Sequence, residues 1–228
     1  MKNKFSLYQK WTSDYLSNEE IDGMCAIIIY NTFRLLMLNG IKVENYDWFD
    51  ADIIKQLSII DLNDNCDELT SFHISLFKMF NNYPVSSSYE QISKEYEIIL
   101  NKADNNIISC IKKKHLYMFN KIALDNILLI GCLLECYRSY EILVGNAIFR
   151  TIIKREIISI EAITSAYSFL CMQQNTKGYW GFYTQKEYNI NDIRAILCIS
   201  FDCIATILKY EGFLVRKISD NIVSNKQG

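Results

Sequence analysis

Apolar residues recur every three or four positions along most of this chain, the spacing of a helix with one buried face. The sequence Ser17-Asn-Glu-Glu20 is typical of a capping box and predicts a helix from Ile21 to Leu38, ended by Asn39-Gly40. No stretch alternates apolar and polar residues with the period of two that strands show. We therefore expect an all-α fold with about eight or nine helices. The other predicted helices cover 52–62, 67–82, 87–102, 106–119, 120–139, 141–153, 159–174 and 191–210, the last ending at Glu211-Gly212.

Turn-forming residues are rare in this chain. Its 228 residues include 1 Pro and 8 Gly, too few for the many turns of a β-sandwich or barrel. No long linker divides the chain, so we expect a single helical domain over residues 1–216 and a polar, frayed tail over 217–228. Helix pairs recur at roughly 45–55 residues, close to the two-helix repeats of solenoids and toroids. This period predicts antiparallel helical hairpins.

Charge and cysteine usage narrow the partners and the compartment. Lys and Arg number 24 against 26 Asp and Glu, a formal net charge of −2, so no overall field attracts nucleic acid. No stretch holds the roughly 18–20 apolar residues that a membrane span needs. The first residues lack the apolar core of a signal peptide. Most of the 8 Cys lie in apolar helical stretches, where thiols pack as small hydrophobes, so we expect a reducing cytoplasm.

Residues 166–181 carry a spaced motif in which Gln174 is followed by Gly178 and Trp180. This spacing resembles the QW repeat of the α/α-toroid superfamily, which includes triterpene cyclases. The resemblance implies a partial α/α-toroid or curved helical solenoid, and it implies that the motif braces the fold. In such a brace the Gln caps helix carbonyls, the Gly allows a positive φ, and the Trp covers the next helix. Asp67–His73 and Asp125–Tyr137 resemble parts of a small group of uncharacterised bacterial toroid-like proteins.

The catalytic motifs of toroid enzymes are missing from the sequence. Only Asp50-Ala-Asp52 partly matches the Asp-x-Asp-Asp motif of class II terpene cyclases, and the Asp-Asp-x-x-Asp motif of class I synthases is absent. The adjacent Cys-His pair that lanthionine cyclases use for zinc is absent too. The resemblance therefore implies a shape without a mechanism, and we expect neither a cofactor nor a metal.

Two carboxylates interrupt the most apolar helical segments. Asp202 lies within 195–208, and Glu135 lies within 120–139, a segment so apolar on all sides that we expect it to be enclosed by neighbours. A buried carboxylate needs a partner or a raised pKa. Two alternatives remain open: a site residue facing a central cavity, or a buried ion pair. The arginines considered for such a pair are Arg138, Arg150 and Arg194.

His73 and the cysteines offer further candidate chemistry. His73 is a general acid or base beside Asp67, Glu68 or Thr70, or a structural histidine satisfied by one buried hydrogen bond. Cys132 and Cys136 lie one helical turn apart and could bind a soft metal with Cys66, Cys110 or His73. Their apolar context favours core packing instead. His115 ends the run Lys112-Lys-Lys114-His, which predicts a solvated helix face.

The loop after residue 174 is rich in aromatic residues. Such a cluster can form the wall of a pocket for an apolar ligand or peptide, or it can cover the helical core. The residues concerned are Tyr179, Trp180, Phe182, Tyr183 and Tyr188.

The sequence leaves two functional hypotheses. The chain has no phosphate loop, dinucleotide fingerprint, Gly-x-Ser-x-Gly elbow or His-Glu-x-x-His motif. We expect a non-catalytic binding or scaffold protein whose concave helical face takes a peptide or a partner enzyme; the resemblance implies a bacterial pathway for peptide natural products. The alternative is a small toroid-like enzyme acting on an apolar or peptide substrate, with Asp202, Glu135 and His73 as acid or base.

Overall fold

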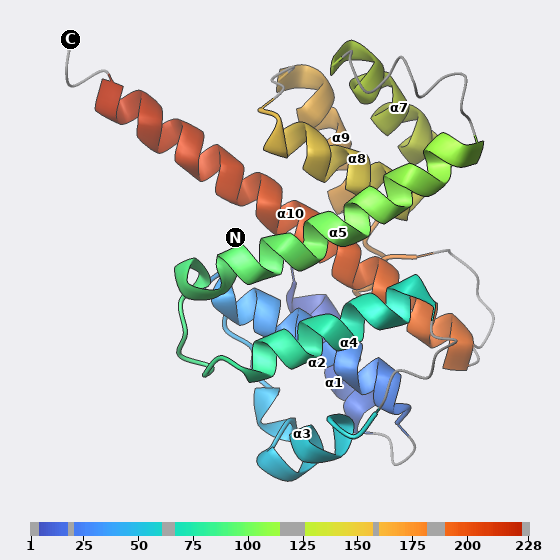
Figure 1. The fold of residues 1–228 in the computed structure, drawn as a ribbon, viewed down its shortest axis with the longest axis vertical. Coiled ribbons are helices and arrows are strands. Elements are labelled where there is room, and N and C mark those ends of the chain that lie inside the picture. The colour runs from blue at the N-terminus through green and yellow to red at the C-terminus, as the bar shows by residue number, and fades with distance from the viewer. Residues whose placement is uncertain are drawn as a thin grey trace. The chain divides into compact units, whose positions relative to one another are not determined.

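The computed structural model describes residues 5–17, 21–60, 67–114, 126–156, 160–181 and 190–224 (Figure 1). These residues form nine α-helices and one short 3-10 helix. Among them, the only β-type pairing is a single bridge between Gln174 and Trp180. The all-α prediction is confirmed. No helix in the described part of the chain is both long enough and apolar enough to cross a membrane.

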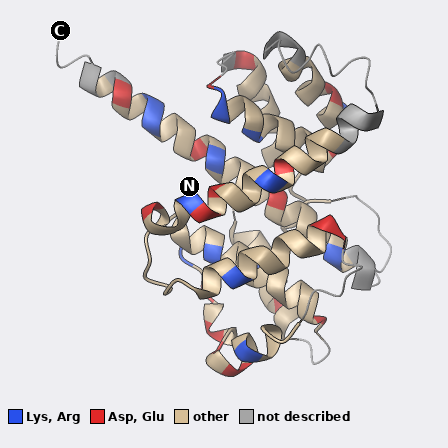
Figure 2. Cartoon of the chain, in the orientation of Figure 1, with Lys and Arg blue, Asp and Glu red and all other residues tan. Residues whose placement is uncertain are grey.

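The chain groups into two compact units. Unit 1 comprises Met1–Ala103 and Gln173–Phe201, and unit 2 comprises Asp104–Met172 and Asp202–Gly228. Helices α5 (Tyr89–Lys114) and α10 (Ile190–Ser224) contribute residues to both units. Lys and Arg are interspersed with Asp and Glu along the described helices (Figure 2). The single domain over residues 1–216 stays a prediction.

Aspartate side chains start three helices of unit 1. Asp22, Asp50 and Asp67 each accept a hydrogen bond from the backbone N–H three residues ahead, at 3.1, 2.8 and 2.8 Å. Each side chain thereby satisfies one of the free N–H groups at a helix start. Unit 1 contains α1 (Ser6–Leu16), α2 (Gly23–Leu38), the 3-10 helix η1 (Tyr46–Trp48), α3 (Ala51–Leu57), α4 (Glu68–Asn81) and parts of α5 and α10.

The predicted boundaries are wrong at three places. Ser17 ends α1, a helix that the pattern did not predict, and α2 starts at Gly23 after Asp22 rather than at Ile21. Residues 18–20 of the expected capping box lie outside the described residues. The helices expected over 87–102 and 106–119 are, as far as residue 114 where the described range ends, one helix, α5. Helix α10 continues through Gly212 to Ser224, since the buried ring of Phe213 offsets the roughly 1 kcal/mol that an interior glycine costs.

Helix α2 is the centre of unit 1, and every residue from Met24 to Leu36 is buried. It packs on α4: the rings of Tyr30 and Phe77 lie 5.0 Å apart, and Asn31 Nδ2 donates to the carbonyl of His73 at 2.8 Å. Arg34 Nη2 donates to the carbonyls of Phe80, Tyr83 and Pro84 at 3.3, 2.9 and 3.2 Å. The guanidinium of Arg34 therefore caps the carboxyl end of α4.

Unit 2 is built on a hairpin of α7 (Asn126–Arg138) and α8 (Ile142–Lys154), with α9 (Ile160–Met172) packed against α7. The expectation that segment 120–139 is enclosed on all sides is wrong for its described part. Leu129, Leu133 and Tyr137 recur every four residues and are buried, whereas Leu134 and Glu135 are exposed. One face of α7 therefore packs against neighbouring helices. On this face the ring of Tyr137 stacks on the ring of Phe169 in α9, with ring centroids 5.1 Å apart.

Candidate functional site

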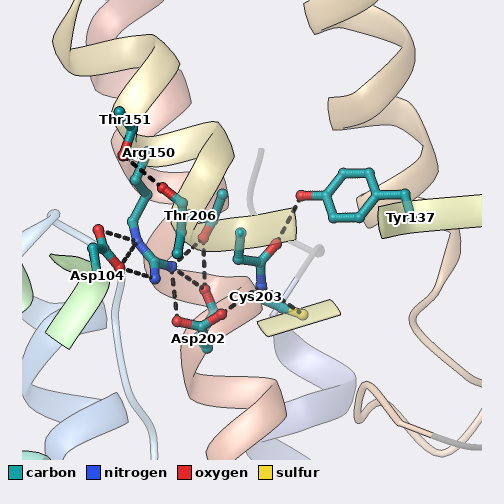
Figure 3. Close-up of polar contacts among 9 residues, drawn as sticks. Asp104, Tyr137, Arg150, Thr151, Asp202, Cys203 and Thr206 are labelled. Atoms are coloured by element: carbon teal, nitrogen blue, oxygen red, sulfur yellow. Dashed lines mark hydrogen bonds and ion pairs between the residues drawn. The ribbon is translucent and has the colours of Figure 1, made fainter. Parts of the chain in front are cut away.

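A buried arginine in unit 2 joins residues from three helices (Figure 3). Arg150 of α8 is 1% exposed and meets Asp104 of α5 and Asp202 of α10. Its Nε donates to both carboxylate oxygens of Asp104 at 3.1 and 3.0 Å, and its Nη2 pairs with Oδ1 of the same residue. Its Nη1 lies 2.7 Å from Asp202 Oδ1. Arg150 thus holds two carboxylates at once.

Neutral side chains complete this Arg150 centre, which we define as Asp104, Tyr137, Asn146, Arg150, Asp202, Cys203 and Thr206. Asn146 Nδ2 donates to Asp202 Oδ2 at 2.7 Å and lies 3.6 Å from Cys203 Sγ; its Oδ1 accepts from the Tyr137 hydroxyl at 2.7 Å. Thr206 Oγ1 accepts from Arg150 Nη1 at 2.6 Å and donates to the carbonyl of Asp202 at 2.8 Å. The buried polar groups of the Arg150 centre therefore form hydrogen bonds with one another in place of water.

In the Arg150 centre, one guanidinium faces two carboxyl groups. Burial raises the pKa of Asp202 above its ordinary value; Arg150 opposes this shift, and the neighbouring Asp104 adds to it. Burial also raises the pKa of the Cys203 thiol well above its usual range, so the thiol stays protonated. Of the two alternatives for Asp202, the structure shows the buried ion pair, and its partner is Arg150.

The other predicted acid or base residues lie in different surroundings. Glu135 is exposed and pairs with Arg138 of its own helix at 3.0 Å. His73 belongs to unit 1, is 1% exposed, and packs edge-on against the ring of Phe201 at 4.9 Å. Neither imidazole nitrogen has a hydrogen-bond partner among the described residues, so the predicted buried hydrogen bond is wrong there. Burial lowers the pKa of His73 to about 3, while Asp67 has a smaller, opposing effect.

The motif at Gln174, Gly178 and Trp180 forms a closed turn in unit 1. Gly178 has φ +105°, which confirms the predicted positive angle. The expected capping of helix carbonyls by Gln174 is wrong, because its Nε2 donates to the carbonyl of Gly178 in the turn at 2.7 Å. The backbone of Trp180 exchanges hydrogen bonds with the Ser200 hydroxyl of α10 at 3.0 and 3.3 Å. The Trp180 ring is 1% exposed, so this turn supports packing.

The structure describes two members of the aromatic loop that was expected either to wall a pocket or to cover the helical core. Tyr179 is 5% exposed and its ring lies 4.7 Å from that of Trp11 in α1, while Trp180 is buried in the turn. Phe182, Tyr183 and Tyr188 lie outside the described residues. In the described part, these aromatic side chains cover helices.

The two cysteines of α7 have free thiols. Cys132 and Cys136 are half-buried, and burial raises the pKa of Cys136 to about 11. Cys66, His115 and the side chain of Cys110 lie outside the described residues. Within the described ranges, no group of three or more His, Cys, Asp or Glu side chains is arranged to hold a metal ion.

A pocket of about 350 Å³ opens between α2, α3 and α4 of unit 1. We call it the α2–α4 pocket. No motif in the sequence points to this pocket, although Ile74, Phe77, Lys78 and Asn81 recur at helical spacing, which indicates a face with an apolar centre and a polar edge. Apolar side chains form its floor: Ile27, Leu57, Ile60, Ile74 and Phe77. Polar side chains form its rim: Ser58, Lys78, Asn81 and Asn82.

Comparisons with known proteins show no relative. No protein-family model matches the chain, and no curated protein or solved structure is significantly similar to it. The resemblance of residues 166–181 to toroid proteins therefore depends on the Gln-Gly-Trp motif alone. Evidence for a function comes from the geometry within each unit.

Proposed function

We propose that this protein is a non-catalytic binding protein that takes a peptide segment in the α2–α4 pocket. One observation carries the proposal: the pocket combines an apolar floor with a polar rim, and its described lining contains no Asp, Glu, His or Cys. Ligand pockets typically pair an apolar lining with a few polar groups that fix orientation. Acid–base catalysis needs a titratable group within reach of the substrate, and among the described lining residues that group is a single lysine, Lys78, with no carboxyl or imidazole beside it in the lining.

The residues expected to act as acid or base support binding over the alternative of a small toroid-like enzyme. Asp202 is engaged by Arg150 and Asn146 and is 9% exposed. Glu135 pairs with Arg138 on the outer face of α7. His73 is buried, and its low pKa keeps the ring neutral at physiological pH. None of the three lines the pocket.

We also propose an arrangement of the helices and a biological context for this protein. The partial toroid or curved solenoid, with a concave face for a peptide or partner enzyme, is supported by the α7–α8 hairpin and by the closed turn from Gln174 to Trp180. The resemblance of that turn to QW repeats supports a role beside enzymes of a bacterial peptide natural-product pathway, in the cytoplasm.

The proposal can be tested with an array of immobilised peptides rich in Leu, Ile and Phe and the purified full-length chain. Ser58→Trp places a large ring at the pocket rim and should abolish saturable binding, because the floor becomes inaccessible. Ser75→Trp is the matched control. Both serines are exposed and donate to the carbonyl four residues before them, at 2.7 and 2.8 Å, but only Ser58 lines the pocket.

The expected result is saturable binding that Ser58→Trp removes and Ser75→Trp preserves, with peptide masses unchanged after incubation. Equal binding by both variants would show that the pocket is not the site. A peptide whose mass changes in the presence of the chain would establish the enzyme alternative instead.

A further inference from the structure

The rim of the α2–α4 pocket has a cation with no anionic partner among the described residues. Lys78 lies in the last turn of α4, is exposed, and forms no ion pair with any described carboxylate. Lysine ammonium groups carry three donors and no acceptor. The lining therefore combines a positive charge with the apolar side chains of Ile74 and Phe77, which lie on the same helix as Lys78.

A neighbouring amide is held in a fixed orientation at the same rim. The hydroxyl of Tyr30, itself 2% exposed, donates to Asn81 Oδ1 at 2.6 Å. This bond holds the amide oxygen against Tyr30, and the Nδ2 group of Asn81, which carries two donors, has no acceptor among the described residues. A ligand atom at the rim thus meets hydrogen-bond donors from Asn81 and Lys78, a combination that suits an anion.

A second cation reinforces the carboxyl end of α4. Arg34 is 2% exposed, donates to the carbonyls of Phe80, Tyr83 and Pro84, and pairs with no described carboxylate. The end of a helix normally carries partial negative charge that repels anions. Here the guanidinium offsets that charge, so a carboxylate beside Lys78 is not opposed by the helix end.

We propose that the α2–α4 pocket binds the C-terminal residue of a peptide, with its apolar side chain on the pocket floor and its free carboxylate against Lys78 and the Asn81 amide. This inference rests on the proposed binding function and names the ligand end that the site recognises. Charge-assisted hydrogen bonds to a carboxylate are about twice as strong as neutral ones, which gives the free end its advantage over an internal residue.

The volume and the rim favour a peptide over a free alkyl acid. An apolar cavity of about 150 Å³ holds one benzene molecule, so a pocket of about 350 Å³ accommodates one Leu, Ile or Phe side chain with its carboxylate. A free acid would use Lys78 and Asn81 only. The Ser58 hydroxyl, which donates its hydrogen to Ile54, keeps lone pairs that can accept from a peptide N–H, and the Asn82 amide can donate to a peptide C=O.

The test uses fluorescence polarisation with the full chain and a fluorescein-labelled hexapeptide, Gly-Ser-Gly-Ser-Gly-Leu, as the free acid and as the C-terminal amide. The free acid should bind about tenfold more tightly than the amide. Lys78→Gln should reduce the affinity for the acid to that for the amide. Lys55→Gln, which removes an exposed lysine of α3 outside the pocket lining, should preserve the difference.

The outcomes separate this inference from the proposed function. If acid and amide bind equally and Ser58→Trp weakens both, peptide binding at the pocket stands and recognition of a free C-terminus is overturned. If the peptides bind and Ser58→Trp has no effect on either, both proposals fail. If octanoate displaces the labelled acid at concentrations equal to the unlabelled peptide, the carboxylate comes from a free acid and the peptide assignment is overturned.

Discussion

Replacing Arg150 by Met is expected to lower the free energy of unfolding by about 3–5 kcal/mol at pH 7. Met keeps the length and apolar stem of the side chain but removes the guanidinium. Arg150, Asp104 and Asp202 are 1%, 4% and 9% exposed, so water cannot take the place of the lost charge. The substitution therefore strands two carboxyl groups inside unit 2.

The size of this loss in free energy of unfolding is limited by the cost of protonating a carboxylate that has lost its partner. At pH 7, taking up a proton costs a carboxyl of ordinary pKa 3.8 about 4 kcal/mol, and this sets a ceiling on the penalty for each one. The ceiling falls by about 1.4 kcal/mol for each unit by which the pH is lowered. The cost of Arg150→Met should therefore be about 2–3 kcal/mol smaller at pH 5 than at pH 7.

Urea unfolding followed by far-ultraviolet circular dichroism measures both quantities, since the midpoint and slope give the free energy of unfolding. The matched control is Arg138→Met. The Arg138 side chain is 80% exposed and pairs with Glu135 on the same helix, so its loss should change stability by about 0.5 kcal/mol or less. A cost for Arg150→Met as small as that of the control, or equal costs at pH 5 and pH 7, would refute the description of a desolvated, charge-rich centre.

Three further predictions concern single buried positions. Because burial raises the pKa of Asp202, its ionisation costs stability as the pH rises above its ordinary value of 3.8. In urea unfolding, the stability of Asp202→Asn relative to the wild type should therefore increase as the pH rises from 4 to 7, and a difference that does not change with pH would contradict this. Gly178→Ala should cost about 2 kcal/mol or more, because its φ is +105° and a Cβ would overlap the backbone of Leu7. Gly131→Ala, in a helix with open space around the glycine, should instead raise the free energy of unfolding by about 0.5–1 kcal/mol. Thermal melts in which Gly178→Ala is as stable as Gly131→Ala would disprove the close approach to Leu7. His73 has a pKa near 3 when folded against an ordinary 6.5, so stability falls as the pH drops from 6.5 towards 3. His73→Leu should remove that acid-side loss, and a variant that still loses as much stability between pH 6.5 and pH 4 would be evidence against a sealed imidazole.

The sequence by itself determined the helical class and several boundaries, because these depend on neighbours within a few residues. Asp67 marks the start of α4, and the predicted 141–153 and 159–174 lie within two residues of α8 and α9 at each end. Helix α1 was missed because its buried face consists of Tyr8, Thr12 and Leu16, of which only Leu16 is plainly apolar. The burial of Thr12 depends on tertiary packing, which periodicity does not report.

Only the tertiary structure decided which partners the functional groups have. The sequence named three arginines for Asp202, and packing in unit 2 selected Arg150 together with Asp104, a residue that the pattern had not marked. The α2–α4 pocket likewise depends on Ile27, Leu57 and Ile74, which are up to 47 residues apart in the chain. Helix formation is governed by local hydrogen bonds and side-chain spacing, whereas ion pairs and cavities depend on which helix faces meet, and that is settled by the burial of the whole chain.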